Sequence, residues 1–145
     1  MTVILRAFAR GKPTDRDALV VDLGFRVIER WGLVACFGPI AFRAVSALVC
    51  AAGALSLDDL AEAAWGDCPD GGPEFTARNL WRHISTARAA LAPLGVVVAV
   101  ERQKWYRARI LAAPASQADR ESAMLRPGNS TFARERRKAE AVDSA

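Results

Sequence analysis

The chain has 145 residues, a length that fits one domain with short extensions. Its 52% hydrophobic and 25% charged residues are typical of a globular protein and exclude the disordered and fibrous classes. The net charge of +4 allows a polyanionic partner but is too small to require one.

Membrane-spanning, secreted and zinc-stabilised classes are not expected. No apolar run is long enough for a spanning helix, and the first ten residues lack the apolar core of a signal peptide. Cys36, Cys50 and Cys68 are far apart and His83 is the only histidine, so we expect no metal or other cofactor. Unpaired thiols fit a reducing compartment, and we expect a cytoplasmic protein.

Charge is unevenly distributed along the chain. Residues 56–74 carry six acidic side chains and no Lys or Arg, whereas residues 75–113 carry seven basic side chains and one acidic side chain. A weakly basic chain therefore contains a strongly acidic segment followed directly by a strongly basic one. This asymmetry says more about partners than the net charge does.

The N-terminal part of the chain predicts a small sheet. We assign residues 1–17 to an N-terminal arm. Three short runs rich in β-branched and aromatic residues follow at 18–23, 25–29 and 33–37, and Gly24 and the corner at Trp31-Gly32 separate them. These runs predict strands of an antiparallel sheet.

Two helices are predicted next. After Gly38-Pro39, apolar residues recur at three- and four-residue steps as far as residue 52, which is the pattern of one helix face. Ser56 is a favourable N-cap for a second helix, with Asp59 three residues later in a position close to a capping box. Gly66 ends this second helix.

A loop, a third helix and a hairpin complete the predicted domain. Residues 67–73 form a loop by composition, and a third helix begins near 74–76 and runs to about residue 92, where Pro93 stops it. The β-branched run at 96–100 and the alternating run at 105–110 predict a β-hairpin.

The order of these elements defines the predicted fold. A small sheet, three helices and a hairpin give an α+β winged helix-turn-helix at residues 18–112. Residues 113–145 form a polar, basic C-terminal tail, with a short helix predicted from 131 to 141.

The third helix carries the candidate DNA-binding face. A core stripe runs from Leu80 to Leu91, and Arg78 and Arg82 form a pair of like charges one turn apart, which costs a few tenths of a kcal/mol without a partner. Arginine donates two parallel hydrogen bonds to guanine or reaches phosphates, and small neighbours let the helix approach a groove closely. Opposite the stripe lie Arg78, Arg82, Ser85 and Ala89, with Thr86 beside them.

The hairpin supplies further cations. Arg102, Gln103 and Lys104 occupy its tip, where two cations and an amide suit phosphate or minor-groove contacts. Arg88 and Arg107 are secondary candidates for phosphate contacts. His83 is interpreted as a packed helix residue, because no neighbouring nucleophile or acid suggests a catalytic role.

These residues give the chain a resemblance to the OmpR/PhoB-type winged-helix DNA-binding domain over about residues 18–111. The resemblance implies a stand-alone member, since about 17 residues precede the sheet in place of a phosphoacceptor receiver domain. It also implies that the loop between the second and third helices can contact RNA polymerase through Asp67, Asp70 and Glu74. The matching residues are Ser56-Leu-Asp-Asp-Leu60, Ala64-Trp65-Gly66, Asn79, His83-Ile84-Ser85, Arg88, Leu91, Arg102 and Trp105-Tyr106-Arg107.

We therefore expect a sequence-selective double-stranded DNA-binding regulator of bacterial or phage transcription, located in the cytoplasm with the nucleoid. It would place the third helix in the major groove and the wing on the backbone or minor groove, as a monomer or a homodimer on DNA. The alternative is a protein-interaction module that keeps the winged helix without binding DNA. A third possibility is a non-specific nucleic-acid arm in the cluster at 134–138. No paired carboxylates or nucleophile–base set indicate an enzyme.

Overall fold

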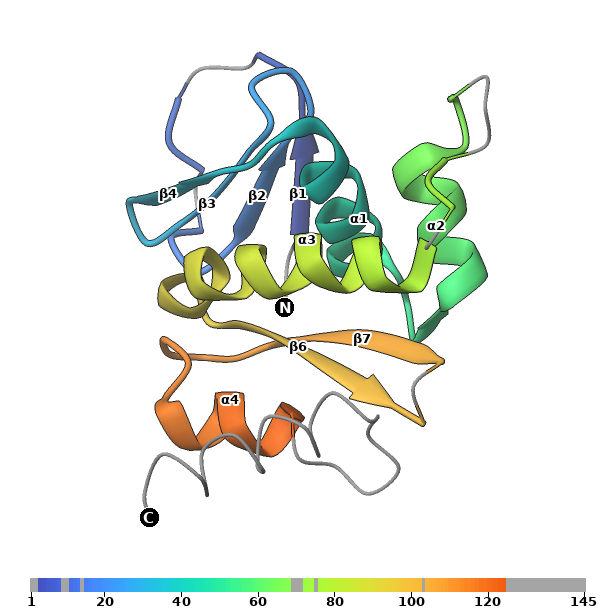
Figure 1. Cartoon of the computed structure of the whole chain (residues 1–145). Helices are drawn as coiled ribbons and strands as arrows, with labels where there is room; N and C mark the ends of the chain where they lie inside the picture. Colours follow the sequence, from blue (N-terminus) through green and yellow to red (C-terminus); the bar gives the residue numbers. More distant parts are fainter. Residues whose placement is uncertain are drawn as a thin grey trace.

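The computed structural model describes residues 3–8, 11–13, 15–68, 72–74, 76–102 and 104–124. The protein is of mixed α+β class, and these residues contain a four-stranded sheet, a three-stranded sheet and four α-helices. Helix α3 crosses the middle of the molecule, with the four-stranded sheet and helices α1 and α2 on one side and strands β6 and β7 on the other (Figure 1).

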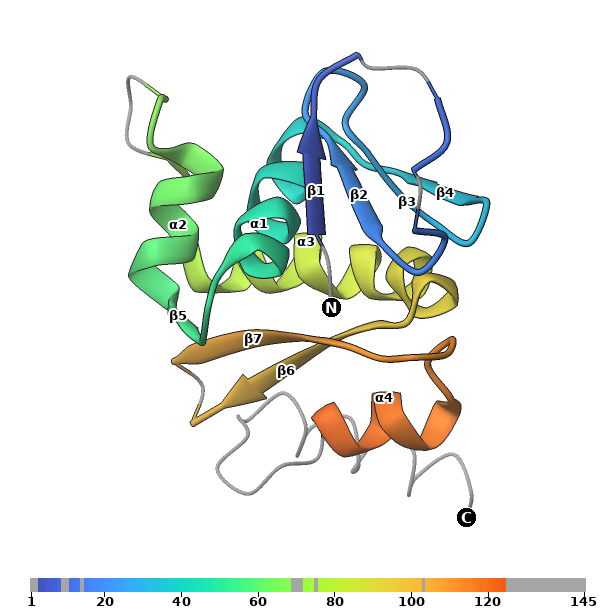
Figure 2. The ribbon, with the colours of Figure 1, turned by 180° about the vertical axis from the view of Figure 1, so that it is seen from behind.

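The four-stranded sheet has the order β1-β2-β3-β4 (Figure 2). The strands predicted at 18–23, 25–29 and 33–37 are confirmed, with shifted ends, as β2 (Leu19–Asp22), β3 (Val27–Arg30) and β4 (Leu33–Cys36), which pair antiparallel. The β3–β4 turn is Trp31-Gly32, and both residues have positive φ, 53° and 78°. This two-residue turn matches the twist of the flanking strands.

Residues 1–17 are predicted to form an arm outside the domain. This prediction is wrong for residues 3–6, which form a strand of the four-stranded sheet. Val3–Arg6 forms β1, which pairs with β2 in parallel, so the sheet is mixed rather than wholly antiparallel. Val3 packs against the main core, which explains why this short apolar run is ordered on the sheet. Parallel neighbours cannot be joined by a tight turn, so a crossover connection must lie between β1 and β2.

Asp22 organises the end of this sheet. Its Oδ1 atom accepts hydrogen bonds from the backbone N–H groups of Phe8, Gly24 and Phe25 at 3.1, 3.0 and 3.0 Å. These bonds, led by the one from Phe25, hold the pKa of the Asp22 carboxyl below its ordinary value, against the opposing effect of burial. The β1 end and the β2–β3 turn are therefore fastened to one carboxylate.

The three predicted helices are present. Helix α1 (Pro39–Cys50) begins with proline in its first turn, as expected after Gly38, but ends before the predicted residue 52. Helix α2 (Leu57–Trp65) starts at the predicted capping box, in which the Ser56 side chain accepts from the Asp59 N–H at 3.1 Å. Helix α3 (Thr76–Leu91) is followed by the 3₁₀ turn η1 (Ala92–Leu94).

The three-stranded sheet has the order β5-β7-β6. The predicted hairpin is confirmed as β6 (Val96–Glu101) and β7 (Trp105–Ile110), paired antiparallel. The sequence did not predict β5 (Leu55–Ser56), a two-residue strand that pairs with β7 just before α2 begins. Through β5, the hairpin is hydrogen-bonded to the start of α2.

The domain extends past residue 112. Helix α4 (Gln117–Met124) packs on β6, where Ala123 forms a small buried cluster with Val97 and Ala99. These two β6 residues face away from the main core, so α4 covers the second face of the hairpin. The predicted helix at 131–141 lies outside the described residues.

One core joins both sheets. Side chains of β2, β3, the first three helices and the hairpin form a single buried cluster. The β-branched run that predicted β6 is buried over its whole length, because α3 covers one face and α4 the other. The Leu80, Ile84, Ala87 and Leu91 stripe of α3 is buried as predicted.

Arg30 is the largest fully buried side chain, 2% exposed. It leaves β3 and donates from Nη1 to the carbonyl oxygens of Leu94 and Leu111, at 3.0 and 2.6 Å, and from Nε to that of Asp17 at 2.9 Å. Its guanidinium also lies 3.9 Å from the ring centre of Trp31. Arg30 thus connects the four-stranded sheet to both strands of the hairpin at its open end.

Candidate nucleic-acid interface

The outer face of α3 carries the predicted cations. Arg78, Arg82, Ser85, Thr86 and Ala89 are exposed, on the side opposite the buried stripe. No acidic residue occurs in this helix, so its face is positively charged along its first half. The geometry expected from the helical wheel is therefore present.

Arg82 has the clearest position among these residues. Within the described part of the chain, its guanidinium makes neither an ion pair nor a hydrogen bond. Its backbone carbonyl accepts from the Thr86 hydroxyl at 3.0 Å, so the hydroxyl proton of Thr86 is already hydrogen-bonded within the helix. Ser85 remains as the small polar group beside Arg82. Arg78 is also exposed, although it makes contacts of its own within the chain.

Arg88 is engaged inside the protein. It is half-buried, and its Nη2 donates to the carbonyl oxygen of Arg120 at 3.2 Å. Arg120 belongs to α4, so Arg88 connects the last turn of α3 to the helix that covers the hairpin. The prediction of a phosphate contact for Arg88 is therefore unsupported by its orientation.

The tip of the hairpin presents two of the predicted residues. Arg102 and Lys104 are exposed, whereas Gln103 lies outside the described residues. The Lys104 carbonyl accepts from the Leu57 N–H at 2.9 Å, which fixes the tip beside the first residue of α2. The tip therefore has a defined position relative to the helices.

Strand β7 alternates between core and surface. Tyr106 is 4% exposed and anchors the hairpin, whereas Trp105 is 44% exposed, which confirms that these neighbours point to opposite faces. Arg107 lies on the same outer face as Trp105 and is exposed. It therefore stays available to an external partner.

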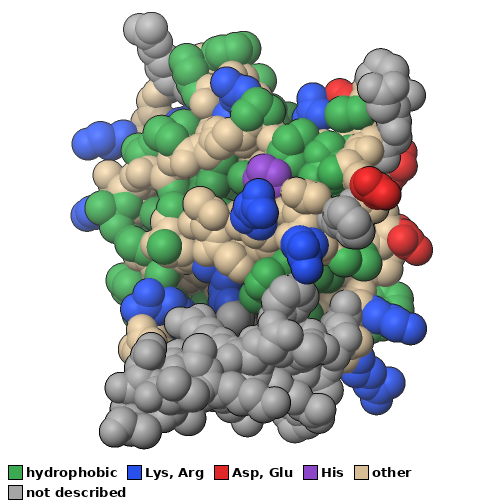
Figure 3. All heavy atoms as spheres, viewed as in Figure 1, with side chains coloured by type: hydrophobic (Ala, Val, Ile, Leu, Met, Phe, Trp, Pro, Cys, Tyr) green, Lys and Arg blue, Asp and Glu red, His purple; other side chains and the backbone are tan. Residues whose placement is uncertain are grey.

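Figure 3 shows how charge is arranged around α3. Lys and Arg side chains lie over the helix and at the hairpin tip, whereas Asp and Glu side chains gather at the right of this view, over α2. Asp58, Asp59 and Glu62 of α2 are exposed. A polyanion in contact with α3 and the tip would therefore have to avoid the outer face of α2.

The acidic loop after α2 is partly neutralised within the chain. Asp67 Oδ1 accepts from Arg43 Nη1 of α1 at 2.6 Å; the Asp67 side chain is largely exposed and that of Arg43 is partly buried. Glu74 is exposed, and Asp70 lies outside the described residues. The contact between Arg43 and Asp67 could not be expected from sequence alone, because the two residues are 24 positions apart.

His83 is a packed helix residue, as predicted. Its ring is half-buried and meets the ring of Trp65 edge to face, with 6.2 Å between ring centres. The described ranges contain no group of His, Cys, Asp or Glu side chains arranged to hold a metal ion. None of the helices in those ranges combines the length and apolar character needed to cross a bilayer.

Comparison with known proteins gives no match to a protein-family model, a curated protein or a solved structure. The functional proposals therefore rest on the residues and geometry of this chain.

Proposed function

We propose that this protein is a winged-helix, sequence-selective double-stranded DNA-binding regulator of transcription. The observation that carries the proposal is the exposed cationic face of α3, with Arg78, Arg82 and Ser85 directed away from the core. A helix of this kind fits the major groove, where arginine discriminates guanine through two acceptor atoms.

The arrangement of the other elements supports this proposal. Three helices are followed by a hairpin, and β5 closes the three-stranded sheet in the order β5-β7-β6. In a winged helix-turn-helix the hairpin flanks the groove-binding helix. Arg102 and Lys104 at its tip, and Arg107 along β7, supply cations for phosphates or the minor groove.

Each cation has a distinct expected role. Arg82, with Arg78 and Ser85, contacts bases or the adjacent phosphates, and Thr86 contributes its methyl group because its hydroxyl is occupied. Arg102, Gln103 and Lys104 contact the backbone. Arg88 supports the interface indirectly, through α4.

Duplex binding can be measured by fluorescence anisotropy over a range of salt concentrations. With about five phosphates neutralised, the logarithm of the affinity falls with log salt at a slope of about −4 to −5. Arg82→Ala should cost roughly 1–3 kcal/mol on the preferred site, and Lys104→Ala should weaken all duplexes alike. Arg16→Ala is the matched control, because Arg16 is an exposed arginine on the β1–β2 connection. A salt-independent affinity, or equal effects of Arg82→Ala and Arg16→Ala, would refute the proposal.

The preferred sequence can be found by selection from a random duplex pool. Two spaced half-sites among the selected sequences would identify a homodimer on DNA. Contact of the 67–74 loop with RNA polymerase is part of the proposal. Among the described residues of this loop, Asp67 and Glu74 are exposed acids. Asp67→Asn with Asp70→Asn and Glu74→Gln should lower activated transcription without changing DNA affinity, and unchanged transcription would remove this contact.

A protein-interaction module is the second candidate function. It is favoured by the apolar end of the four-stranded sheet, where Leu5, Phe8, Leu23 and Phe25 are each more than half exposed. Clusters of exposed apolar side chains are typical of protein contacts. A titration with random duplex at low salt separates the two functions, because a module of this kind would bind no duplex.

A further inference from the structure

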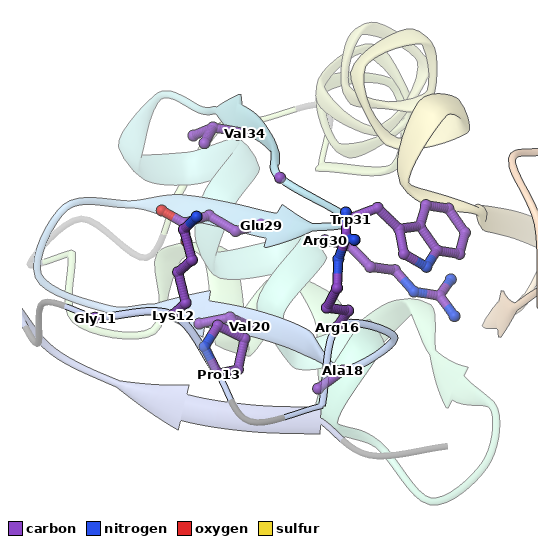
Figure 4. A pocket seen from close by; sticks show the side chains of 11 residues that line it. Gly11, Lys12, Pro13, Arg16, Ala18, Val20, Glu29, Arg30, Trp31 and Val34 are labelled. Carbon is purple, nitrogen blue, oxygen red and sulfur yellow. The ribbon is translucent and has the colours of Figure 1, made fainter.

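A pocket of about 480 Å³ lies on the outer face of the four-stranded sheet, on the face opposite the α1 core (Figure 4). Its floor includes Val20, Glu29 and Val34, which are register partners across β2, β3 and β4. Lys12, Pro13 and Arg16 of the β1–β2 connection line its side. The pocket thus lies between a strand surface and the segment that crosses it.

The parallel pairing of β1 and β2 explains the cavity. A connection between neighbouring parallel strands returns across a face of the sheet and is usually a helix, whose side chains fill that face. Here the described residues between β1 and β2 contain no helix. Gly11 has φ of 120°, and a Cβ at this position would meet no atom within 4 Å, while its carbonyl oxygen accepts from Arg6 Nη1 at 3.0 Å.

The pocket has unbalanced positive charge. Lys12 and Arg16 are exposed, and neither has an ion-pair partner among the described residues. The acidic side chain in the lining, Glu29, already accepts from Arg6 Nη2 at 3.0 Å. Glu29 therefore neutralises Arg6 rather than Lys12 or Arg16. A negatively charged group is the complement that these two cations lack.

The lining also has an apolar part. Pro13 and Val34 contribute aliphatic surface, and Trp31 lies at one end. Trp31 has φ of 53°, an unusual conformation for a bulky residue, and it is held by a hydrogen bond from its Nε1 to Asp17 Oδ1 at 2.8 Å. Strained residues persist where neighbouring contacts fix them, often beside binding sites. Figure 4 shows Trp31 turned toward Arg30, which leaves the middle of the pocket open.

We propose that this pocket binds a small organic anion, a carboxylate or phosphate ester carried on an apolar ring. The volume lies within the range of small-molecule sites, and the combination of apolar walls with a few charged groups is typical of them. Lys12 and Arg16 hold the anionic group, while Val34 and Pro13 contact the ring. This inference does not depend on DNA binding.

The site can be tested with 2-naphthoate, 2-naphthyl phosphate and the uncharged 2-naphthamide, followed by chemical shifts of the backbone amides. We expect at least one of the two anions to bind one-to-one with a Kd of about 1 mM or tighter, and the amide to bind at least about tenfold more weakly. The shifts should centre on the amides of Gly11, Lys12, Glu29 and Val34. Comparison of the carboxylate with the phosphate identifies the preferred anion.

Variants test the assigned residues. The double variant Lys12→Gln with Arg16→Gln should weaken the anion about tenfold or more, and Val34→Glu should weaken it by placing a negative charge at the rim. Val34 is 57% exposed, so this change is compatible with folding. Arg26→Gln is the matched control, because Arg26 is exposed and does not line the pocket, and it should leave anion binding unchanged. Absence of saturable binding by both anions, equal affinity for the amide, or full affinity in the double variant would overturn the proposal.

Discussion

Replacing Arg30 with methionine should destabilise the whole domain. The substitution keeps an unbranched, flexible side chain that fills the inner part of the space, although methionine is shorter than arginine and does not reach the place of the guanidinium. It removes the donors that reach the carbonyl oxygens of Leu94 and Leu111. These two carbonyls flank the open end of the hairpin, one just before β6 and one just after β7, and they are 64 and 81 residues from Arg30 along the chain.

The expected cost follows from these lost partners. Each carbonyl left without a donor away from water costs about 1–3 kcal/mol. Methionine carries no charge, so the substitution also removes the cost of burying a guanidinium, which offsets part of this loss. Burial lowers the pKa of Arg30, whereas Asp17 and Asp15 oppose that shift. We therefore expect a loss of about 3 kcal/mol in the free energy of unfolding, a large part of the 5–15 kcal/mol typical of a domain. This loss lowers Tm by roughly 6–12 °C.

Urea unfolding followed by circular dichroism measures the loss, provided that the slope with denaturant stays constant. Arg30→Lys should recover only part of it, because an ammonium group cannot reproduce the planar set of donors. Arg107→Met is the control, since Arg107 is exposed, and should change stability by less than about 0.5 kcal/mol. A stability of Arg30→Met within about 0.5 kcal/mol of the parent would refute the bridging role.

Three further substitutions test separate parts of the fold. Ser56→Ala removes the N-cap of α2 and should cost about 1 kcal/mol in urea unfolding, whereas no loss would contradict the capping box. Asp22→Asn should be less stable than the parent at neutral pH. Because the pKa of Asp22 is lowered in the native protein, the stability advantage over Asp22→Asn is present above the unfolded pKa and disappears as pH falls through the native pKa. A stability difference between the two proteins that stays constant down to pH 2 would contradict this. Ala123→Asp places a charge against β6 and should speed hydrogen exchange of α4 amides, with unchanged exchange as the opposing result.

Elements with local signals could be predicted from the sequence. Proline at the start of α1, the Ser56 cap of α2 and Gly95 after η1 each mark a boundary through a backbone requirement of the residue itself. The exposed face of α3 also follows from periodicity, because a helix with one buried stripe must present the opposite side chains to solvent. Arg82 and Ser85 were therefore placed on the surface correctly.

Features that depend on distant partners could not be predicted. The parallel pairing of Val3–Arg6 is decided by the sheet, since three apolar residues followed by an arginine suit either strand direction. Helix α4 has a polar sequence and is held mainly through Ala123 on β6, so its apolar pattern is too weak to mark it. The Arg88 contact with Arg120 spans 32 residues, and no sequence signal distinguishes it from a solvent-exposed arginine.

Gly95 is constrained twice by its position beside Arg30. Its φ of 70° disfavours any other residue, and a Cβ would come within 2.8 Å of the Ala113 carbonyl oxygen and of Arg30 Nη1, and within 3.0 Å of the Trp31 ring. Loss of the glycine during evolution would therefore require compensating changes at Arg30 and Trp31. We expect these three positions, far apart along the chain, to covary in any lineage that descends from this sequence.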